Sequence, residues 1–287
     1  MSALTVVTGA TGNIGGSLVA ALASAGRPVR AVVRGEADAA RFAEDGVQSA
    51  IGDLNEPSTL VSALAGADAL FLLPGYADMP GVYAAAREAG IGHVVQLSGT
   101  SAGLGDMSNA VTEYMVRSEQ AAAESKLPHT VVRPSAFMTN ALRWADQVRT
   151  GDTVTLPFPT KAAACLHPAD LGAVIAAVFA APDRYAGEVL LPTGPEALLP
   201  RDQVAVLAGV LDRPLQFVGL TDEQARESMA ADGTPQRYID AFLDFYAEET
   251  GTLDESPVRT TVADVTGTAP RTFAEWAADN AAAFTRS

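Results

Sequence analysis

The chain is poor in cysteine, in basic residues and in long apolar runs. Its single cysteine, Cys165, excludes an intramolecular disulfide, and its apolar neighbours favour a buried small side chain over a reactive thiol. Nineteen basic residues against thirty-four acidic ones leave a formal charge of −15 at pH 7. Because this charge repels the phosphates of nucleic acids and of anionic membranes, we expect no nucleic-acid partner and no membrane partner.

Other signals are missing as well. No apolar run reaches membrane-spanning length, and no charged-then-apolar leader precedes the first expected strand near Leu4, so we expect a cytoplasmic protein. The three histidines are isolated from one another and from Cys165, which gives no metal-ligand spacing. We therefore expect no metal site.

The most informative stretch of the sequence lies near its start. A short β-branched run leads into a turn that carries Gly9, Gly12 and Gly15, and a helical segment follows. The first glycine allows a tight turn, the second lets a pyrophosphate approach the backbone, and the third lets the helix pack closely on the strand. The turn is either a dinucleotide site or an ordinary strand-to-helix connection that happens to contain glycines. Its Gly-x-x-Gly-x-x-Gly spacing resembles that of extended and atypical short-chain dehydrogenases/reductases.

Arg34 closes the second expected strand, residues 29–33, where many dinucleotide sites place an acidic residue for the adenosine ribose. A carboxylate there would repel a 2′-phosphate, whereas a guanidinium can bind it with paired, charge-assisted hydrogen bonds. The residue therefore favours NADP(H) over NAD(H). The alternative is a solvated surface arginine.

Strands and helices alternate regularly up to Pro134. Strands are expected near residues 4–7, 29–33, 47–51, 69–73, 93–97 and 129–133, with helices at 38–44, 58–64, 80–89 and 107–126. This pattern predicts an α/β fold with a Rossmann-type, doubly wound parallel sheet over residues 1–150. Residues 151–287 are expected to form a smaller, mainly helical C-terminal lobe that is interleaved with the first domain. Within the lobe we expect a helix over 168–181 and strands at 187–191 and 215–218, with the substrate pocket between the two parts.

Polar or aromatic residues follow several of these strands. The carboxylate of Asp53 could accept from the adenine amine or could begin the next helical turn. The strand before Pro74 stops abruptly, which exposes backbone groups to the cofactor, and we assign Tyr76 to the substrate side of the site. Ser98 would face the nicotinamide end of a dinucleotide lying across the sheet edge.

Segments 8–15, 30–34, 52–54 and 127–140 together resemble the NmrA-like family of atypical short-chain dehydrogenases/reductases. The resemblance is most specific over residues 3 to about 145. It implies a Rossmann domain with a small C-terminal lobe and a preference for NADP(H). The family includes both NADPH-dependent quinone reductases and nucleotide-sensing regulators.

The resemblance also implies roles for individual residues. Those expected to line the pyrophosphate are Gly9, Thr11, Gly12, Asn13, Ile14 and Gly15, and Arg34 would bind the 2′-phosphate. Those expected near the adenine are Asp53 and Leu54, and those near the nicotinamide ribose are Leu72, Leu73, Pro74 and Ser98. Phe137 and Asn140 would flank the nicotinamide and the substrate.

The sequence departs from catalytic short-chain dehydrogenases at one point. Those enzymes use a tyrosine with a lysine four residues later, which lowers the pKa of the phenol. Here Tyr114 is followed at that spacing by Ser118. Tyr114 and His167 remain candidate proton donors, although their sequence context favours a core position for Tyr114 and a structural position before a helix for His167.

The missing lysine favours one class of chemistry. Reduction of a simple ketone produces an alkoxide, about as basic as hydroxide with a pKa of about 15.7, which needs a nearby proton donor. Reduction of a quinone produces a phenolate with a pKa of about 10 or lower, for which water or a weak donor suffices. We therefore expect an NADPH-dependent oxidoreductase that transfers hydride to a quinone or similar conjugated carbonyl of an aromatic small molecule. The alternative is a non-catalytic NADP(H)-binding redox sensor that acts through a protein partner. The sequence is compatible with a homodimer but does not fix the oligomeric state.

Overall fold

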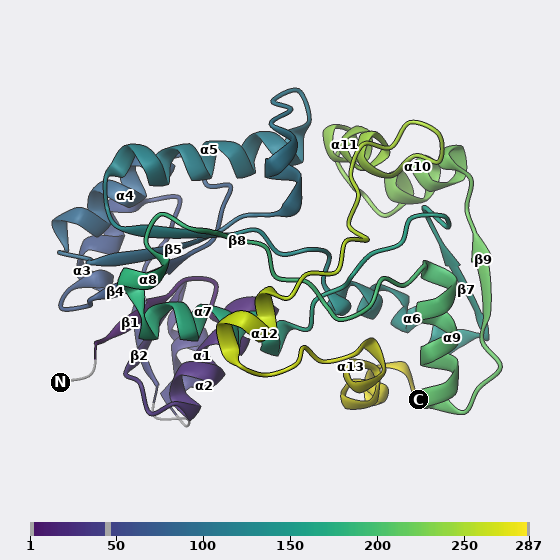
Figure 1. Cartoon of the computed structure of the whole chain (residues 1–287), viewed down its shortest axis with the longest axis horizontal. Helices are drawn as coiled ribbons and strands as arrows, with labels where there is room; N and C mark the ends of the chain where they lie inside the picture. Colours follow the sequence, from purple (N-terminus) through teal and green to yellow (C-terminus); the bar gives the residue numbers. More distant parts are fainter. Residues whose placement is uncertain (1–2, 44–46, 286–287) are drawn as a thin grey trace.

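A parallel sheet forms the centre of the larger part of the molecule (Figure 1). The computed structural model describes residues 3–43 and 47–285, and within them the sheet has seven strands in the order β3-β2-β1-β4-β5-β6-β8, with every neighbouring pair parallel. These strands are β1 (Thr5–Val7), β2 (Val29–Val33), β3 (Gln48–Ile51), β4 (Ala69–Leu72), β5 (His93–Leu97), β6 (His129–Val132) and β8 (Val189–Leu190). The predicted Rossmann-type α/β fold is confirmed.

Helices cover both faces of this sheet. On one face lie α1 (Asn13–Ser24), α2 (Glu36–Ala43), α7 (Pro168–Ala180), α8 (Pro182–Tyr185) and α12 (Thr261–Thr266). On the other lie η1 (Pro57–Thr59), α3 (Leu60–Leu64), α4 (Met79–Glu88) and α5 (Ala110–Ser125), with the 3₁₀ turn η2 (Thr100–Leu104) before α5. Helices α1 and α7 pack closely because α7 has Gly172 at the contact, where a Cβ atom would lie 2.8 Å from the Ser17 carbonyl oxygen.

A smaller lobe follows the sheet and lies to its right in Figure 1. Its strands β7 (Thr153–Leu156) and β9 (Gln216–Gly219) form a two-stranded parallel sheet. Its helices are η3 (Met138–Trp144), α6 (Ala145–Thr150), α9 (Pro200–Leu211), α10 (Asp222–Ala231), α11 (Gln236–Tyr246), α13 (Phe273–Asp279) and η4 (Ala281–Phe284). The lobe has its own aromatic core, in which the rings of Phe273 and Trp276 stack at 5.4 Å.

The two halves of the chain share the large sheet and its helical layers. Strand β8 pairs with β6, α7 packs on α1, and α12 packs on α7, although all three elements follow residue 150. The central sheet is therefore covered by segments from both halves of the chain.

Two elements differ from the sequence-based expectation. The long helix expected over 107–126 begins at Ala110, because the Asn109 side chain accepts hydrogen bonds from the backbone N–H groups of Val111 and Thr112. Strand β7 was not expected, since its only partner, β9, lies about sixty residues further along the chain. The last residue of the expected helix 38–44, Glu44, lies outside the described residues.

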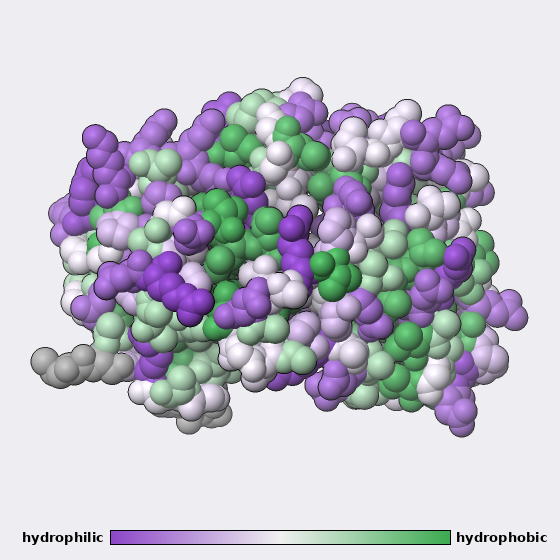
Figure 2. All heavy atoms as spheres, viewed as in Figure 1, coloured by the Kyte–Doolittle hydropathy of each residue, from purple (hydrophilic) through white to green (hydrophobic). Residues whose placement is uncertain are grey.

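The surface of the molecule is mixed in polarity. Figure 2 shows small groups of apolar residues surrounded by hydrophilic side chains on the face that it presents. None of the helices in residues 3–43 and 47–285 is both long and apolar enough to cross a bilayer.

Candidate functional site

The glycine turn follows β1, the strand at which the strand order of the sheet reverses. Strands β2 and β3 lie on one side of β1, and β4, β5, β6 and β8 lie on the other. Thr8, at the end of β1, ties this strand to β4: its Oγ1 donates to the Phe71 carbonyl at 2.9 Å and accepts from the Leu73 N–H at 3.2 Å. Gly9 then turns the chain with φ of +63°. This position, beyond the carboxyl ends of the central strands, is where open parallel sheets bind dinucleotides.

The turn leaves room for a phosphate group. A Cβ atom at Gly15 would overlap the Gly9 carbonyl oxygen, so the first turn of α1 packs against the glycine turn with no side chain between them. Gly12 is the N-cap of α1 and has no side chain with which to cap it. The first N–H groups of α1 and the positive end of its dipole are therefore available to an anion. The neighbouring Thr11 and Asn13 are exposed, whereas Ile14 packs partly against the core.

Tyr76 lies within electrostatic reach of two charged side chains, Arg34 and Asp53. Arg34 is exposed and has no hydrogen-bond or ion-pair partner among the described residues. Burial raises the pKa of the Tyr76 hydroxyl; the charge of Arg34 lowers this pKa and that of Asp53 raises it, so Tyr76 lies within electrostatic reach of both. Tyr76 is thus placed with the proposed 2′-phosphate and adenine residues, and it is not part of the cavity lining described below.

Asp53 and Leu54 have local structural partners. The Asp53 Oδ1 accepts hydrogen bonds from the Asn55 backbone N–H at 2.9 Å and from the Asn55 Nδ2 at 3.0 Å, which closes a turn after β3. The Leu54 side chain is buried in the core beneath α3 and α4. These hydrogen bonds support the interpretation of Asp53 as a turn residue. Because the Leu54 side chain is buried, only its backbone is suited to contact a nucleotide.

Ser98, at the end of β5, takes part in a partly buried charge network. Its hydroxyl donates to the Glu119 Oε1 at 2.5 Å. Arg133 forms a two-pronged ion pair with the same carboxylate, with its Nε 2.8 Å from Oε1 and its Nη2 2.6 Å from Oε2. This hydrogen bonding raises the pKa of the Arg133 guanidinium. Ser98 is therefore held by Glu119, which the sequence analysis left without a role.

Tyr114 faces a cavity between the two parts of the molecule. The cavity has a volume of about 810 Å³. From the sheet side it is lined by Pro74, Gly75, Val111 and Tyr114. From the lobe it is lined by Arg143, Asp232, Thr234, Tyr238 and Phe242. Burial raises the pKa of the Tyr114 hydroxyl, which has no hydrogen-bond partner among the described residues. A neutral phenol in such a cavity can donate a hydrogen bond to a ligand.

One buried side chain joins the two walls of this cavity. The Nδ2 of Asn109, the residue that caps α5, donates to the Ala241 carbonyl of α11 at 3.0 Å. Asn109 is almost fully buried. It therefore fixes α11, which carries Tyr238 and Phe242, opposite Tyr114 on α5.

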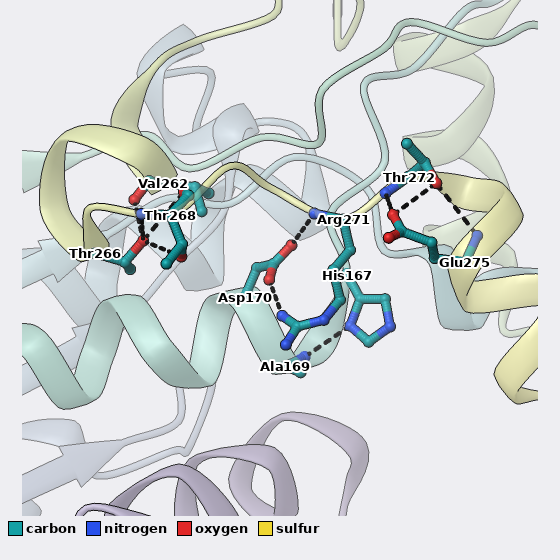
Figure 3. A network of polar contacts seen from close by, with 9 residues as sticks. All are labelled: His167, Ala169, Asp170, Val262, Thr266, Thr268, Arg271, Thr272 and Glu275. Carbon is teal, nitrogen blue, oxygen red and sulfur yellow. Dashed lines mark hydrogen bonds and ion pairs between the residues drawn. The ribbon is translucent and has the colours of Figure 1, made fainter.

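His167 has a structural role at the start of α7 (Figure 3). Its Nδ1 accepts from the Ala169 N–H at 3.0 Å, which makes His167 the N-cap of the helix, and burial lowers its pKa. Asp170 pairs with the side chain and backbone N–H of Arg271 and so attaches the C-terminal segment to α7. His167 does not line the cavity.

The remaining predicted site residues have different surroundings. Leu72 is fully buried and Leu73 half-buried, and Pro74 reaches the cavity. Phe137 pairs through its backbone with Leu166, and Asn140 is exposed one turn later. Neither Phe137 nor Asn140 is among the lining residues of the cavity.

A partly buried acid lies beside the loop that carries Phe137. The Tyr246 hydroxyl donates to the Glu255 Oε2 at 2.7 Å, and the Ala136 backbone N–H also binds this carboxyl group. Burial raises the pKa of Glu255 above that of an ordinary glutamate. Burial likewise raises the pKa of the nearby Cys165 thiol to about 12, so this cysteine is unreactive, as its sequence context suggested.

Sequence reasoning missed most of the lobe's contribution to the cavity. Tyr238 and Phe242 are four residues apart on α11 and so share one face of that helix. This spacing is visible in the sequence, but it does not reveal which part of the protein the face meets. Arg143 gave no sequence signal, because a lone arginine beside a turn is usually solvated.

The comparisons with known proteins agree with this geometry. A family model described as the NmrA-like family matches residues 1–277. The chain is 36% identical to a (4-alkanoyl-5-oxo-2,5-dihydrofuran-3-yl)methyl phosphate reductase from Streptomyces griseus, over 97% of this chain and 98% of that protein. It is 34% identical, with the same coverage of each, to an NAD(P)H azoreductase from Xenophilus azovorans.

Two solved structures share the fold. An NADPH-dependent quinone oxidoreductase from Escherichia coli superimposes with a TM-score of 0.79 at 22% identity, covering 96% of this chain and 98% of its own. A triphenylmethane reductase from Citrobacter sp., crystallised with NADP(H), gives a TM-score of 0.77 at 19% identity and covers 97% and 99%.

Proposed function

The chain belongs to the NmrA-like family, and we propose that it is an NADPH-dependent reductase that transfers hydride to a quinone or similar conjugated carbonyl of an aromatic small molecule. The observation that carries this proposal is the position of the aromatic cavity. Pro74 and Gly75, which follow the central strand β4, form part of its wall, so a substrate there lies next to the edge where a dinucleotide would bind.

The residues at that edge fit NADP(H). The glycine turn offers unshielded N–H groups to the pyrophosphate, and Arg34, whose guanidinium has no partner among the described residues, can bind the 2′-phosphate. When bound, the nicotinamide would supply a hydride, which is a proton together with two electrons. The names of the two relatives, a dihydrofuranyl phosphate reductase and an NAD(P)H azoreductase, support this class of reaction.

Tyr114 is the residue we assign to the substrate. The phenol is protonated at neutral pH, since even an ordinary tyrosine has a pKa of about 10 and burial raises this pKa further, so it can donate a hydrogen bond to the oxygen on which negative charge develops. Because the phenolate product of a quinone has a pKa of about 10 or lower, that hydrogen bond and a proton from water complete the hydroquinone without a lysine. Chemistry that generates an alkoxide would lack the stronger donor that it needs.

The test is NADPH oxidation by the purified protein with a panel of acceptors. The panel contains 1,4-naphthoquinone, an azobenzene, an unsaturated lactone and, as a simple ketone, cyclohexanone. We expect turnover with the conjugated acceptors and none with cyclohexanone. Replacing Tyr114 with Phe should lower kcat with the quinone by roughly ten- to a hundredfold and leave NADPH binding unchanged. Tight NADPH binding without turnover of any acceptor would overturn the reductase and leave the redox-sensor alternative.

A further inference from the structure

The cavity contains a guanidinium that the protein does not use. Arg143, at the end of η3, lines the cavity and is exposed, and no described residue forms a hydrogen bond or an ion pair with its side chain. Other arginines from this part of the chain do have acidic partners: Arg133 pairs with Glu119, and Arg149 with Asp146. In a chain with thirty-four acidic residues and nineteen basic ones, an arginine left without a carboxylate inside a cavity is available to a ligand.

A second guanidinium contacts Tyr238, which lines the same wall as Arg143. The Arg237 side chain stacks on the ring of Tyr238, with its Cζ 4.7 Å from the ring centroid, and its Nη2 donates to the Tyr238 hydroxyl at 3.2 Å. Since that hydroxyl accepts from Arg237, its own proton is free to point toward an acceptor. Tyr238 thus adds a hydrogen-bond donor to the wall that also contains Arg143.

One acidic side chain limits where a negative group can bind. Asp232, just after α10, also lines the cavity and is exposed. It forms no ion pair with Arg143 in the described structure. A ligand with one acidic group would therefore place it at Arg143 and away from Asp232, and the apolar remainder would contact Val111, Tyr114 and Phe242.

From this arrangement we propose that the cavity selects conjugated aromatic substrates that carry one acidic substituent, a carboxylate, sulfonate or phosphate, and that Arg143 binds this group. The proposal names the substrate class of the reductase proposed above and rests on it for turnover. The binding step does not depend on turnover and can be measured alone.

The probe is a pair of azo dyes of the same shape, 4-dimethylaminoazobenzene-4′-sulfonate and its neutral 4′-sulfonamide. Each is titrated into the full-length protein saturated with NADP⁺, which has no hydride to transfer, and the dye absorbance reports binding. The net charge of −15 disfavours the sulfonate, so a preference for it must come from a local cation. We expect the sulfonate to bind about five- to tenfold more tightly than the sulfonamide, because it forms a charge-assisted hydrogen bond with Arg143. The preference is no larger because solvent weakens this bond at an exposed arginine.

Two variants should change this preference in opposite directions. Arg143→Met should bring the sulfonate down to the affinity of the sulfonamide and leave the sulfonamide unchanged. Asp232→Asn should tighten the sulfonate by about two- to threefold, because it removes a nearby like charge. The matched control is Arg87→Met, which changes an exposed arginine of α4 outside the cavity and should alter neither dye.

Equal affinity of the wild-type protein for the two dyes would overturn the proposal. An equal loss of affinity for both dyes in the Arg143→Met variant would also overturn the proposal, because it would mean that the arginine side chain only packs against the ligand. These results are separate from the reductase test: a protein that oxidises NADPH with the quinone but shows no sulfonate preference retains the proposed function and loses this inference. A protein that shows the preference but no turnover loses only the proposed function.

Discussion

The hydroxyl of Ser118 accepts a 3.0 Å hydrogen bond from the backbone N–H of Gly75, and it donates to the carbonyl of Tyr114. Ser118 stands four residues after Tyr114 and is fully buried. In catalytic short-chain dehydrogenases, a lysine at this spacing acts on the tyrosine. In this protein, Ser118 instead fixes the loop after β4, which forms one wall of the cavity. Ser118 thus has a structural role at the position where those enzymes have the lysine.

Replacing Ser118 with Ala should lower the free energy of unfolding by about 1 kcal/mol, because the Gly75 N–H loses its acceptor. Urea unfolding measures the change. The matched control is Ser17→Ala in α1, where the hydroxyl makes the same bond to the carbonyl four residues earlier but accepts from no loop. An equal change in the two variants would show that the bond to Gly75 adds nothing.

Two Gly→Ala substitutions should have opposite effects. Gly15→Ala places a methyl group against the Gly9 backbone and should cost about 1–3 kcal/mol of stability and lower NADPH affinity by more than about tenfold. Gly209→Ala lies in the exposed interior of α9 with open space around it, and it should stabilise the fold by about 0.5–1 kcal/mol. Thermal unfolding and NADPH fluorescence titration measure both effects. Unchanged NADPH binding in Gly15→Ala would remove the glycine turn from the cofactor site.

Arg34→Ala should weaken NADPH binding by about ten- to a hundredfold and leave NADH binding nearly unchanged, because only NADPH carries the 2′-phosphate. Titration of each cofactor by its fluorescence gives the two dissociation constants. Arg41→Ala on the neighbouring α2 is the control, since this exposed arginine forms its one ion pair among the described residues with Asp38 of the same helix. Equal losses for the two cofactors in Arg34→Ala would show that Arg34 does not bind the phosphate.

Glu255 should make stability depend on pH in an unusual direction. Its pKa is raised in the folded protein, chiefly by burial, so its contribution is fully present below the pKa of an unfolded glutamate, about 4.3, and is lost as pH rises through the folded pKa. Glu255→Gln keeps the shape and removes the ionisation. The stability of the wild type relative to this variant should therefore fall as pH increases from about 4 toward neutrality.

Glu275→Gln is the control of opposite sign. Hydrogen bonds from the backbone N–H and the hydroxyl of Thr272 lower the pKa of Glu275, so its contribution is present above the unfolded pKa and is lost on acidification. Urea unfolding at a series of pH values compares the two variants with the wild type. Parallel pH profiles for wild type and Glu255→Gln would contradict the assignment of a buried, hard-to-ionise carboxyl group.

Much of the fold follows from local sequence patterns. The glycine turn, the β-branched runs and the regular alternation of strands and helices up to Pro134 determined the parallel sheet, the place of the dinucleotide edge and the position of Arg34 at the end of β2. These features depend on residues that are close in the chain, where backbone conformation and hydrophobic periodicity decide the outcome.

Only the tertiary structure decided which side chains meet across the chain. Tyr238 and Phe242 face Tyr114 because Asn109 binds the α11 backbone, and Glu119 binds Ser98 and Arg133 because α5 packs over the ends of β5 and β6. The sequence separates these partners by up to about 130 residues. A periodic pattern shows that a face is apolar or polar but does not identify its partner. The cavity, the hydrogen bond from Gly75 to Ser118 and an Arg143 side chain without a partner among the described residues therefore emerge only when the chain is folded.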